Sequence, residues 1–440
     1  MIGMLRAMVR DNPLMASRAE LLREIEASPP AVAPDFSERL LCRSLAAAAA
    51  NIPAYRDAWF ASAATAGLLA EFPLISKKQL LEAPERYYPR LGLKKLVTSI
   101  GKTSGTTGTP LTIFRSLDSV IWEYAFVHRH WAWSGLRRGM PRATLRGDLV
   151  ASADQTEGPF WHFNVWENQL LLSSRHLRTP FVERIVEKLS SFHPYLMQAY
   201  PSTAYELAKY LQTVGRVVPI PFVYTGSEML YSHQRALIEE AFACKVMDFY
   251  GMAERVAFAA QCEHGSYHVH PAYGRVEIVD DEGKPTDTEG FIVGTTVHNL
   301  TMPLVRYQLS DRSRWKRGEC ACGRHFPMIE PISGKFEDVI HGSEGNAISP
   351  SIVTFAFKGL KFIERSQVAE VAPGRWQIRI VPQPGFGVQE RDQLFGNVRT
   401  LIDPGLEIEI VECAEIPRTN AYKYRWIVNE SAQHALAQPS

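Results

Sequence analysis

From about residue 96 onward, short apolar runs alternate with longer segments of helical periodicity. The runs VMDFYG at 246–251 and FIVGTTV at 291–297 carry β-branched and aromatic residues between turn signals, which is typical of strands. FVERIVEKLSSF at 181–192 and QRALIEEAFA at 234–243 place apolar residues three and four apart, as amphipathic helices do. Strands that alternate with helices predict an α/β architecture.

The length and a change in pattern predict more than one domain. A chain of 440 residues is too long for one ordinary core. We expect a large α/β N-terminal domain at 1–334, in which helices flank the sheets and the first 75 residues are helical and Ala-rich. The glycine-containing stretch at 335–345 is the expected hinge. After it, 346–440 alternates strand and helix patterns in a small α+β domain of acceptable size.

Composition and charge argue against nucleic-acid binding, membrane association and secretion. The 48 basic and 47 acidic side chains leave a formal net charge of +1, so no general attraction to nucleic acid or to an anionic membrane is expected. Arg6, Arg10 and Asp11 interrupt the apolar amino terminus, which argues against a signal peptide. The longest weakly charged stretch, 58–70, is too short to span a bilayer. Six cysteines do not form a disulfide framework, and a cytoplasmic location is predicted.

The strongest local signal is the loop TSGTTGTP at 103–110. Its glycines allow close backbone approach to a ligand, and its hydroxyl and N–H groups can surround phosphate oxygens. The candidate nucleotide-binding residues here are Thr103, Ser104, Gly105, Thr106, Thr107 and Gly108. A polar surface loop is the plain alternative. A Walker-type loop is excluded because Leu96 stands where that motif needs a glycine before Gly101-Lys102.

Five segments in order resemble motifs of the adenylate-forming superfamily of acyl-CoA ligases. They are TSGTTGTP, FYGMAE at 249–254, RYQLSD at 306–311, GKFED at 334–338, and PRT at 417–419 followed by Lys423. Further segments are similar to the phenylacetate–CoA ligase-like branch, which includes proteins of capsular polysaccharide and antibiotic biosynthesis. These are FPLISKKQL, AYPSTAYELA, TGSEML and CACGR.

The resemblance implies a site for ATP and Mg²⁺. Glu254 would bind Mg²⁺, as a hard carboxylate oxygen can. Tyr250 would flank the adenine, and Asp311 would accept hydrogen bonds from the ribose. Lys423 would bring a flexible positive charge to the developing phosphate charge. The resemblance also places four further residues in the nucleotide site: Ser227, Glu228, Gly251 and Lys335.

The implied reaction activates a carboxylic acid, an aryl or similar small acid, as an acyl-adenylate with release of pyrophosphate. The acyl group would then pass to coenzyme A. Transfer to an amine or a carrier protein is the first alternative. The sequence departs from the family motifs at five positions: Ala253, Ser310, Lys335, Glu337 and Tyr422. The departures at Ala253, Lys335 and Tyr422 keep open a second alternative, a non-catalytic nucleotide-binding homologue. No feature of the sequence indicates the oligomeric state.

Cysteines and histidines form a candidate structural zinc site. Cys262, Cys320 and Cys322 with one histidine would complete a closed tetrahedral shell between 262 and 322. His264 and His268 are both available. Relatives carry the histidine in a Gly-x-x-His context, which favours His268. Reduced thiols beside unrelated histidines are the alternative.

The Lys423→Ala variant should lose acid-dependent adenylate formation by on the order of a hundredfold or more, because the lysine would stabilise charge that develops only in the transition state. ATP affinity should stay nearly unchanged, and a supplied acyl-adenylate should still be converted. Parental adenylation rates, measured by pyrophosphate exchange, would contradict this role for Lys423.

Overall fold

The structure is a computed structural model, and it describes residues 13–28, 32–89, 91, 98–102, 111–333, 338–348, 350–357, 359–416 and 426–431. These residues divide into two compact units. The first holds the described residues up to 102, then 111–137 and 247–333. The second holds 138–246 and the described residues from 338 onward. Within the described ranges, no helix is both long and apolar enough to cross a membrane.

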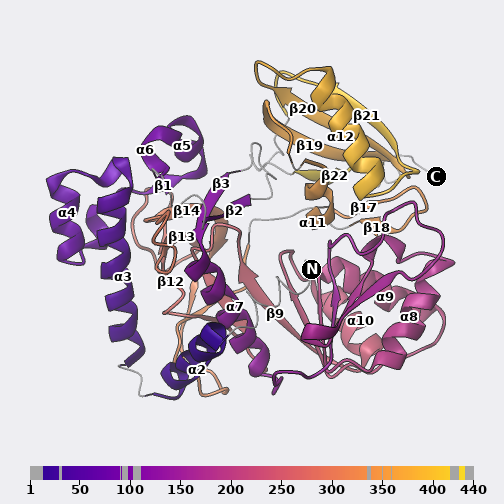
Figure 1. Cartoon of the computed structure of the whole chain (residues 1–440), viewed down its shortest axis with the longest axis horizontal. Coiled ribbons are helices and arrows are strands. Elements are labelled where there is room, and N and C mark those ends of the chain that lie inside the picture. The colour runs from indigo at the N-terminus through magenta and orange to yellow at the C-terminus, as the bar shows by residue number, and fades with distance from the viewer. Residues whose placement is uncertain are drawn as a thin grey trace. The chain divides into compact units, whose positions relative to one another are not determined.

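The first unit begins with helices, as the Ala-rich sequence predicts. Its helical elements are α2 (Pro13–Ala27), α3 (Val32–Asn51), η1 (Pro53–Tyr55), α4 (Ala58–Thr65), η2 (Leu69–Glu71), α5 (Lys77–Glu82), α6 (Pro84–Tyr87) and α7 (Leu117–Ala132). Helix α2 lies beside α7 (Figure 1) and buries Leu22 and Ile25 in a core shared with Trp122 and Phe126. Helix α7 starts at a defined residue because the Ser116 side chain accepts a hydrogen bond from the Ser119 N–H.

Three groups of strands complete the first unit. Their members are β1 (Ile75–Ser76), β2 (Thr98–Lys102), β3 (Thr112–Ser116), β9 (Lys245–Gly251), β10 (Phe258–Gln261), β11 (Tyr267–Val269), β12 (Gly274–Val279), β13 (Gly290–Thr296), β14 (Tyr307–Ser313), β15 (Trp315–Lys316) and β16 (Met328–Ile329). One sheet has the order β1-β14-β13-β12, and β2 pairs with β3 alone. The strands β15-β16-β11-β10-β9 are neighbours in antiparallel order.

The second unit opens with a mostly parallel set of strands. Its elements up to residue 246 are β4 (Arg142–Leu145), β5 (Trp161–Asn164), η4 (Val165–Glu167), β6 (Gln169–Leu172), η5 (Ser174–His176), α8 (Phe181–Phe192), β7 (Leu196–Ala199), α9 (Pro201–Thr213), β8 (Phe222–Gly226) and α10 (Ser232–Phe242). Strands β8, β7, β4 and β6 run parallel, and β5 pairs antiparallel with β6. The three helices contribute Ile185, Leu207 and Ile238 to one core.

The carboxyl-terminal part of the second unit is an α+β arrangement. Its elements are β17 (Ile340–His341), β18 (Ala347–Ile348), α11 (Pro350–Val353), η6 (Thr354–Phe357), β19 (Ile363–Ala372), β20 (Arg375–Pro382), α12 (Val388–Leu401), β21 (Glu407–Glu412) and β22 (Ile427–Asn429). The sheet order is β21-β20-β19-β22, and α12 lies across this sheet (Figure 1). Leu394 and Val398 of α12 pack on Trp376 and Ile378 of β20.

The predicted α/β class with a small α+β carboxyl-terminal part is confirmed. The helices predicted at 181–192 and 234–243 are α8 and α10, and the runs at 246–251 and 291–297 are β9 and β13. The loop 103–110, most of the GKFED segment and the PRT segment with Lys423 lie outside the described residues. The hinge and the mobility of the carboxyl-terminal domain therefore stay predictions.

One ionic contact of the carboxyl-terminal part should make stability depend on pH. The buried Glu370 carboxylate accepts a hydrogen bond from the His341 ring Nδ1 at 3.0 Å, which raises the pKa of His341. A raised folded-state pKa contributes stability below the unfolded value of about 6.5, and this is lost as pH rises through the folded value.

We expect His341→Gln to lower the melting temperature of the protein most at about pH 5.5 and least at about pH 8.5. Exposed His162→Gln is the control. A melting difference between wild type and His341→Gln that is constant over this range would contradict the role of the Glu370 contact.

Candidate functional site

Two strands of the first unit bring the predicted Tyr250 and Asp311 together. Tyr250 lies next to the end of β9, before Gly251, and Asp311 lies within β14. The Tyr250 hydroxyl donates a hydrogen bond to Asp311 Oδ2 at 2.8 Å. Burial raises the pKa of Tyr250 well above its ordinary value, so the phenol stays protonated and remains a donor. The other oxygen, Asp311 Oδ1, is buried and has no hydrogen-bond partner among the described residues.

A second tyrosine–carboxylate pair lies beside the first. Tyr307, at the start of β14, donates a hydrogen bond to Glu254 Oε1 at 3.1 Å. Glu254 is 9% exposed, and burial raises the pKa of Tyr307. The phenol orients the carboxylate, and its remaining lone pairs have no donor within the part of the chain that the structure describes. A carboxylate held in this way can accept a hard cation or a hydrogen-bond donor of a ligand.

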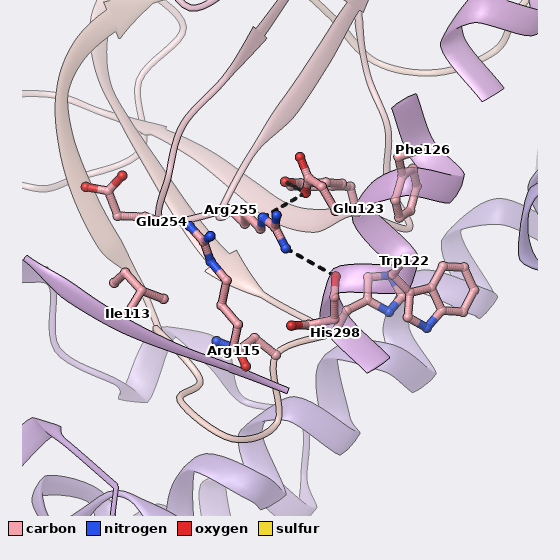
Figure 2. Close-up of a pocket in the computed structure, with 11 residues that line it drawn as sticks. Ile113, Arg115, Trp122, Glu123, Phe126, Glu254, Arg255 and His298 are labelled. Carbon is pink, nitrogen blue, oxygen red and sulfur yellow. Dashed lines mark hydrogen bonds and ion pairs between the residues drawn. The ribbon is translucent and has the colours of Figure 1, made fainter. Parts of the chain in front are cut away.

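A small pocket opens next to Glu254 within the same unit. Figure 2 shows Arg115 reaching from β3 towards Glu254 and Arg255, with Glu123 and Trp122 projecting from α7. Arg255 has a φ of 57°, a left-handed conformation that is strained for a non-glycine residue. Such strain costs of order 1–3 kcal/mol and gathers at functional sites. The pocket therefore combines two cations and two carboxylates beside an apolar wall.

The predicted Ser227 and Glu228 lie in the second unit, directly after β8. Ser227 has a φ of 72° and accepts a hydrogen bond from Arg146 at 2.8 Å. Glu228 Oε2 accepts hydrogen bonds from the Ser202 N–H at 3.2 Å and the Ser202 hydroxyl at 2.7 Å, at the amino terminus of α9. These residues follow the carboxyl ends of parallel strands, where ligands of open α/β sheets bind.

The remaining nucleotide-site predictions fall on residues that the structure does not describe. They are Thr103, Ser104, Gly105, Thr106, Thr107, Gly108, Lys335 and Lys423. Their roles stay predictions.

The four predicted metal ligands come together in space. Cys262 follows β10, His268 lies in β11, and Cys320 and Cys322 precede β16. Their ligand atoms all lie within 4.8 Å of one another. The Cys262 and Cys320 sulfurs are 3.6 Å apart, and Cys322 Sγ is 3.3 Å from His268 Nε2. Tetrahedral bonds to zinc would give separations of about 3.8 Å between sulfurs and about 3.6 Å from sulfur to nitrogen.

The surroundings of this cluster also suit a metal. His268 Nδ1 lies 3.4 Å from the Phe326 carbonyl oxygen, which directs Nε2 towards the cysteines. His264, the open alternative, is exposed and lies outside the cluster. Burial raises the pKa of the Cys262 thiol to about 11, so a metal would have to replace this proton. Arg324, which hydrogen-bonds Cys322, supplies positive charge next to the sulfur atoms and would favour their deprotonated form.

Three residues of these sites were missed from the sequence. Tyr307 lies inside the RYQLSD segment, so a signal for it existed. Arg115 and Arg146 are single charges near the ends of short apolar strands, and nothing local distinguishes them from solvated arginines. Their partners, Ala253 and Ser227, are 138 and 81 residues away along the chain.

Comparisons of the sequence with known proteins find relatives of low identity. Protein CapK of Staphylococcus aureus is 24% identical over 213 residues, which cover 48% of this chain and 46% of that protein. Phenylacetate-coenzyme A ligase of Thermus thermophilus is 26% identical over 286 residues, 62% of each chain. The matched regions thus span about half and about three fifths of these relatives. No protein-family model matches the chain.

The fold is similar to that of solved acyl-CoA ligases. A crystal structure of 2-hydroxyisobutyryl-CoA ligase with 2-HIB-AMP and CoA superposes with a TM-score of 0.59 and 19% identity, over 94% of this chain and 93% of that one. A second structure of that ligase, in its postadenylation state, gives a TM-score of 0.57 with 18% identity over 95% and 94% of the chains. Together these comparisons confirm the resemblance to the phenylacetate–CoA ligase-like branch of the adenylate-forming superfamily.

If the cysteine–histidine cluster holds zinc, the purified protein should contain about one zinc per chain, and chelation should lower its melting temperature, because binding energy at a structural site contributes to folding. Cys320→Ser should lose the metal. Cys413→Ser is the matched control, since Cys413 is a partly buried cysteine outside the cluster. Equal zinc content in both variants, measured by elemental analysis, would contradict the site.

Proposed function

We propose that this protein uses ATP to activate a small carboxylic acid as an acyl-adenylate and then transfers the acyl group to coenzyme A. In the first step a carboxylate oxygen attacks the α-phosphorus of ATP, and the bond to the bridging oxygen of pyrophosphate breaks. In the second step the thiol sulfur of coenzyme A attacks the acyl carbon, AMP leaves, and the thiol proton is released. The relatives named above support this reaction class.

The observation that carries the proposal is the unfinished hydrogen bonding of Asp311. Its Oδ2 is bonded to Tyr250, and its Oδ1 is buried with no partner among the described residues. An unsatisfied buried acceptor costs about 1–3 kcal/mol, and more when it is charged. A ribose hydroxyl would donate to Oδ1 and remove this cost. The adjacent Tyr250 ring would then lie where an adenine can stack.

Glu254 fits the role of a magnesium ligand. It supplies a hard carboxylate oxygen, and Tyr307 fixes its orientation. When bound, Mg²⁺ would supply positive charge that neutralises the phosphates. The contribution of the chain is a carboxylate that is already desolvated and oriented, so little reorganisation is needed when the triphosphate arrives.

Two further parts of the proposal rest on the family motifs. The loop 103–108 would surround the phosphates, and Lys423 would approach from a carboxyl-terminal domain that turns about residues 335–345. Hinges of this kind absorb their φ/ψ change in a few residues. Ser227 and Glu228, directly after β8, are expected to bind nucleotide on the same grounds.

The two steps can be measured separately. Pyrophosphate exchange with ATP across aryl, short aliphatic and amino acids tests the adenylation. If none of the acids supports pyrophosphate exchange, adenylation is contradicted and the non-catalytic nucleotide-binding homologue is favoured. Mass analysis of the product with coenzyme A present tests the acceptor. An adenylate that forms but acylates only an amine or a carrier protein would favour the alternative acceptor.

Replacing Asp311 with asparagine should raise the KM for ATP about 10- to 100-fold, because a charged acceptor facing the ribose is lost. The Asp311→Asn variant should still fold, since the asparagine side-chain oxygen can accept the hydrogen bond from the Tyr250 hydroxyl. Asp287→Asn, which changes an exposed aspartate of the same unit, is the control. An unchanged KM for ATP in Asp311→Asn would show that Asp311 does not bind the nucleotide.

A further inference from the structure

The pocket beside Glu254 contains four charged side chains, and three of them have an ion-pair or side-chain hydrogen-bond partner. Arg255 Nε lies 3.3 Å from a carboxylate oxygen of Glu123, which also accepts a hydrogen bond from the Tyr273 hydroxyl at 2.6 Å. Glu254 accepts its hydrogen bond from Tyr307. Arg115 is the exception. Among the described residues no carboxylate lies within 4.0 Å of its guanidinium.

The hydrogen bonding of Arg115 is also incomplete. One terminal nitrogen donates to the Ala253 carbonyl oxygen, the residue before Glu254. Its Nε is buried and has no partner among the described residues. Burial, together with the nearby Arg255, lowers the pKa of Arg115 to about 10, so the guanidinium keeps its charge at neutral pH. Arg115 is partly buried, and Glu123 and Glu254 act against this lowering from beyond ion-pair distance, so its charge is only partly compensated and a bound anion would complete the pairing.

The backbone makes room for this arginine. Gly101 of β2 pairs with Ile113 of β3, and a methyl group on Gly101 would overlap the guanidinium of Arg115. The arginine thus lies directly over a glycine in the neighbouring strand. The geometry holds the cation inside the pocket instead of letting it extend into solvent, where its charge would be hydrated.

We infer that Arg115 binds the carboxylate of the acid substrate in this pocket. The inference rests on the proposed function and adds a binding residue to it. Arg115 lies next to Ala253-Glu254, so an acid held there would present its carboxylate beside the proposed magnesium ligand. Guanidinium groups match carboxylates well, because two parallel N–H donors can meet two oxygens.

The other walls of the pocket favour the acid over the triphosphate as the occupant. Ile113, Trp122 and Phe126 supply an apolar side, while Ser119 and Asn299 supply neutral polar groups, so the lining suits a single carboxylate better than a polyphosphate. A triphosphate carries several negative charges, whereas the pocket offers one unpaired cation. The cavity of about 20 Å³ has room for about one water molecule, so as it stands it can take the carboxylate group of an acid and not its hydrocarbon body.

Arg115→Met should raise the KM for the acid on the order of a hundredfold in pyrophosphate exchange, with the KM for ATP within about twofold, because a ground-state contact acts on binding. Arg115→Lys should recover part of the loss, since it restores the charge but not the planar fork. Arg275→Met is the control: this arginine of the same unit is paired with Glu38 at 2.7 Å. Melting curves establish that each variant is folded.

Different failures point to different errors. If no acid supports pyrophosphate exchange by the wild-type protein, the proposed function fails, and this inference fails with it. If wild type is active but Arg115→Met raises the KM for ATP instead, the cation serves the phosphates and the inference is wrong. Unchanged constants for both substrates would also overturn it. If Arg115→Met does not fold, Gly101→Ala carries the test, because it displaces the guanidinium while keeping its charge, and an unchanged KM for the acid would then refute the proposal.

Discussion

The candidate site depends on two buried carboxylates that each receive one phenol hydrogen bond. Asp311 and Glu254 are 5% and 9% exposed, and among the described residues their donors are Tyr250 and Tyr307. Desolvation of a carboxylate costs more than one neutral donor returns. Folded proteins are stable by only about 5–15 kcal/mol, so such a cost is a sizeable fraction of the total. The rest of the unit must therefore hold these groups in place until a ligand supplies the missing donors and cations.

The start of β14 is held by one arginine. Arg306 has a φ of 48°, which is strained for a side chain of this size. Its guanidinium contacts both oxygens of Glu277 in β12, at 3.2 and 3.0 Å, and donates to the Phe72 carbonyl oxygen at 3.1 Å. A bidentate, partly buried pair of this kind is stronger than a surface ion pair. This ion pair fixes the position of Arg306, directly before Tyr307. It therefore helps to set the direction in which the Tyr307 and Asp311 side chains project from β14.

The parts of this arrangement that could be predicted from the sequence are local. The helix predicted at 181–192 coincides with α8 because its apolar residues follow the helical period without interruption. Helix α10 begins two residues before the predicted 234, at Ser232, because Gln234 accepts a hydrogen bond from the Tyr231 N–H ahead of the first turn. Tyr250, Glu254 and Asp311 were found through motifs. Their partners were harder to find, since the contacts of Arg115 with Ala253 and of Tyr307 with Glu254 join a strand to the turn after β9 across 138 and 53 residues of chain, and no local pattern indicates such a contact.

The cysteine–histidine cluster bears on the same site through the register of the strands. Cys262 directly follows β10 and His268 lies in β11, where Ala260 pairs with His268. On its other side β10 pairs with β9, and Ala259 lies opposite Tyr250. A closed set of three thiolates and one imidazole leaves no open position for a substrate, so a metal there would have no direct part in chemistry. It would instead hold β10 and β11 in register. Because a slip of one residue turns every side chain of a strand to the opposite face, the register of β10 against β9 fixes which β10 side chains lie beside Tyr250.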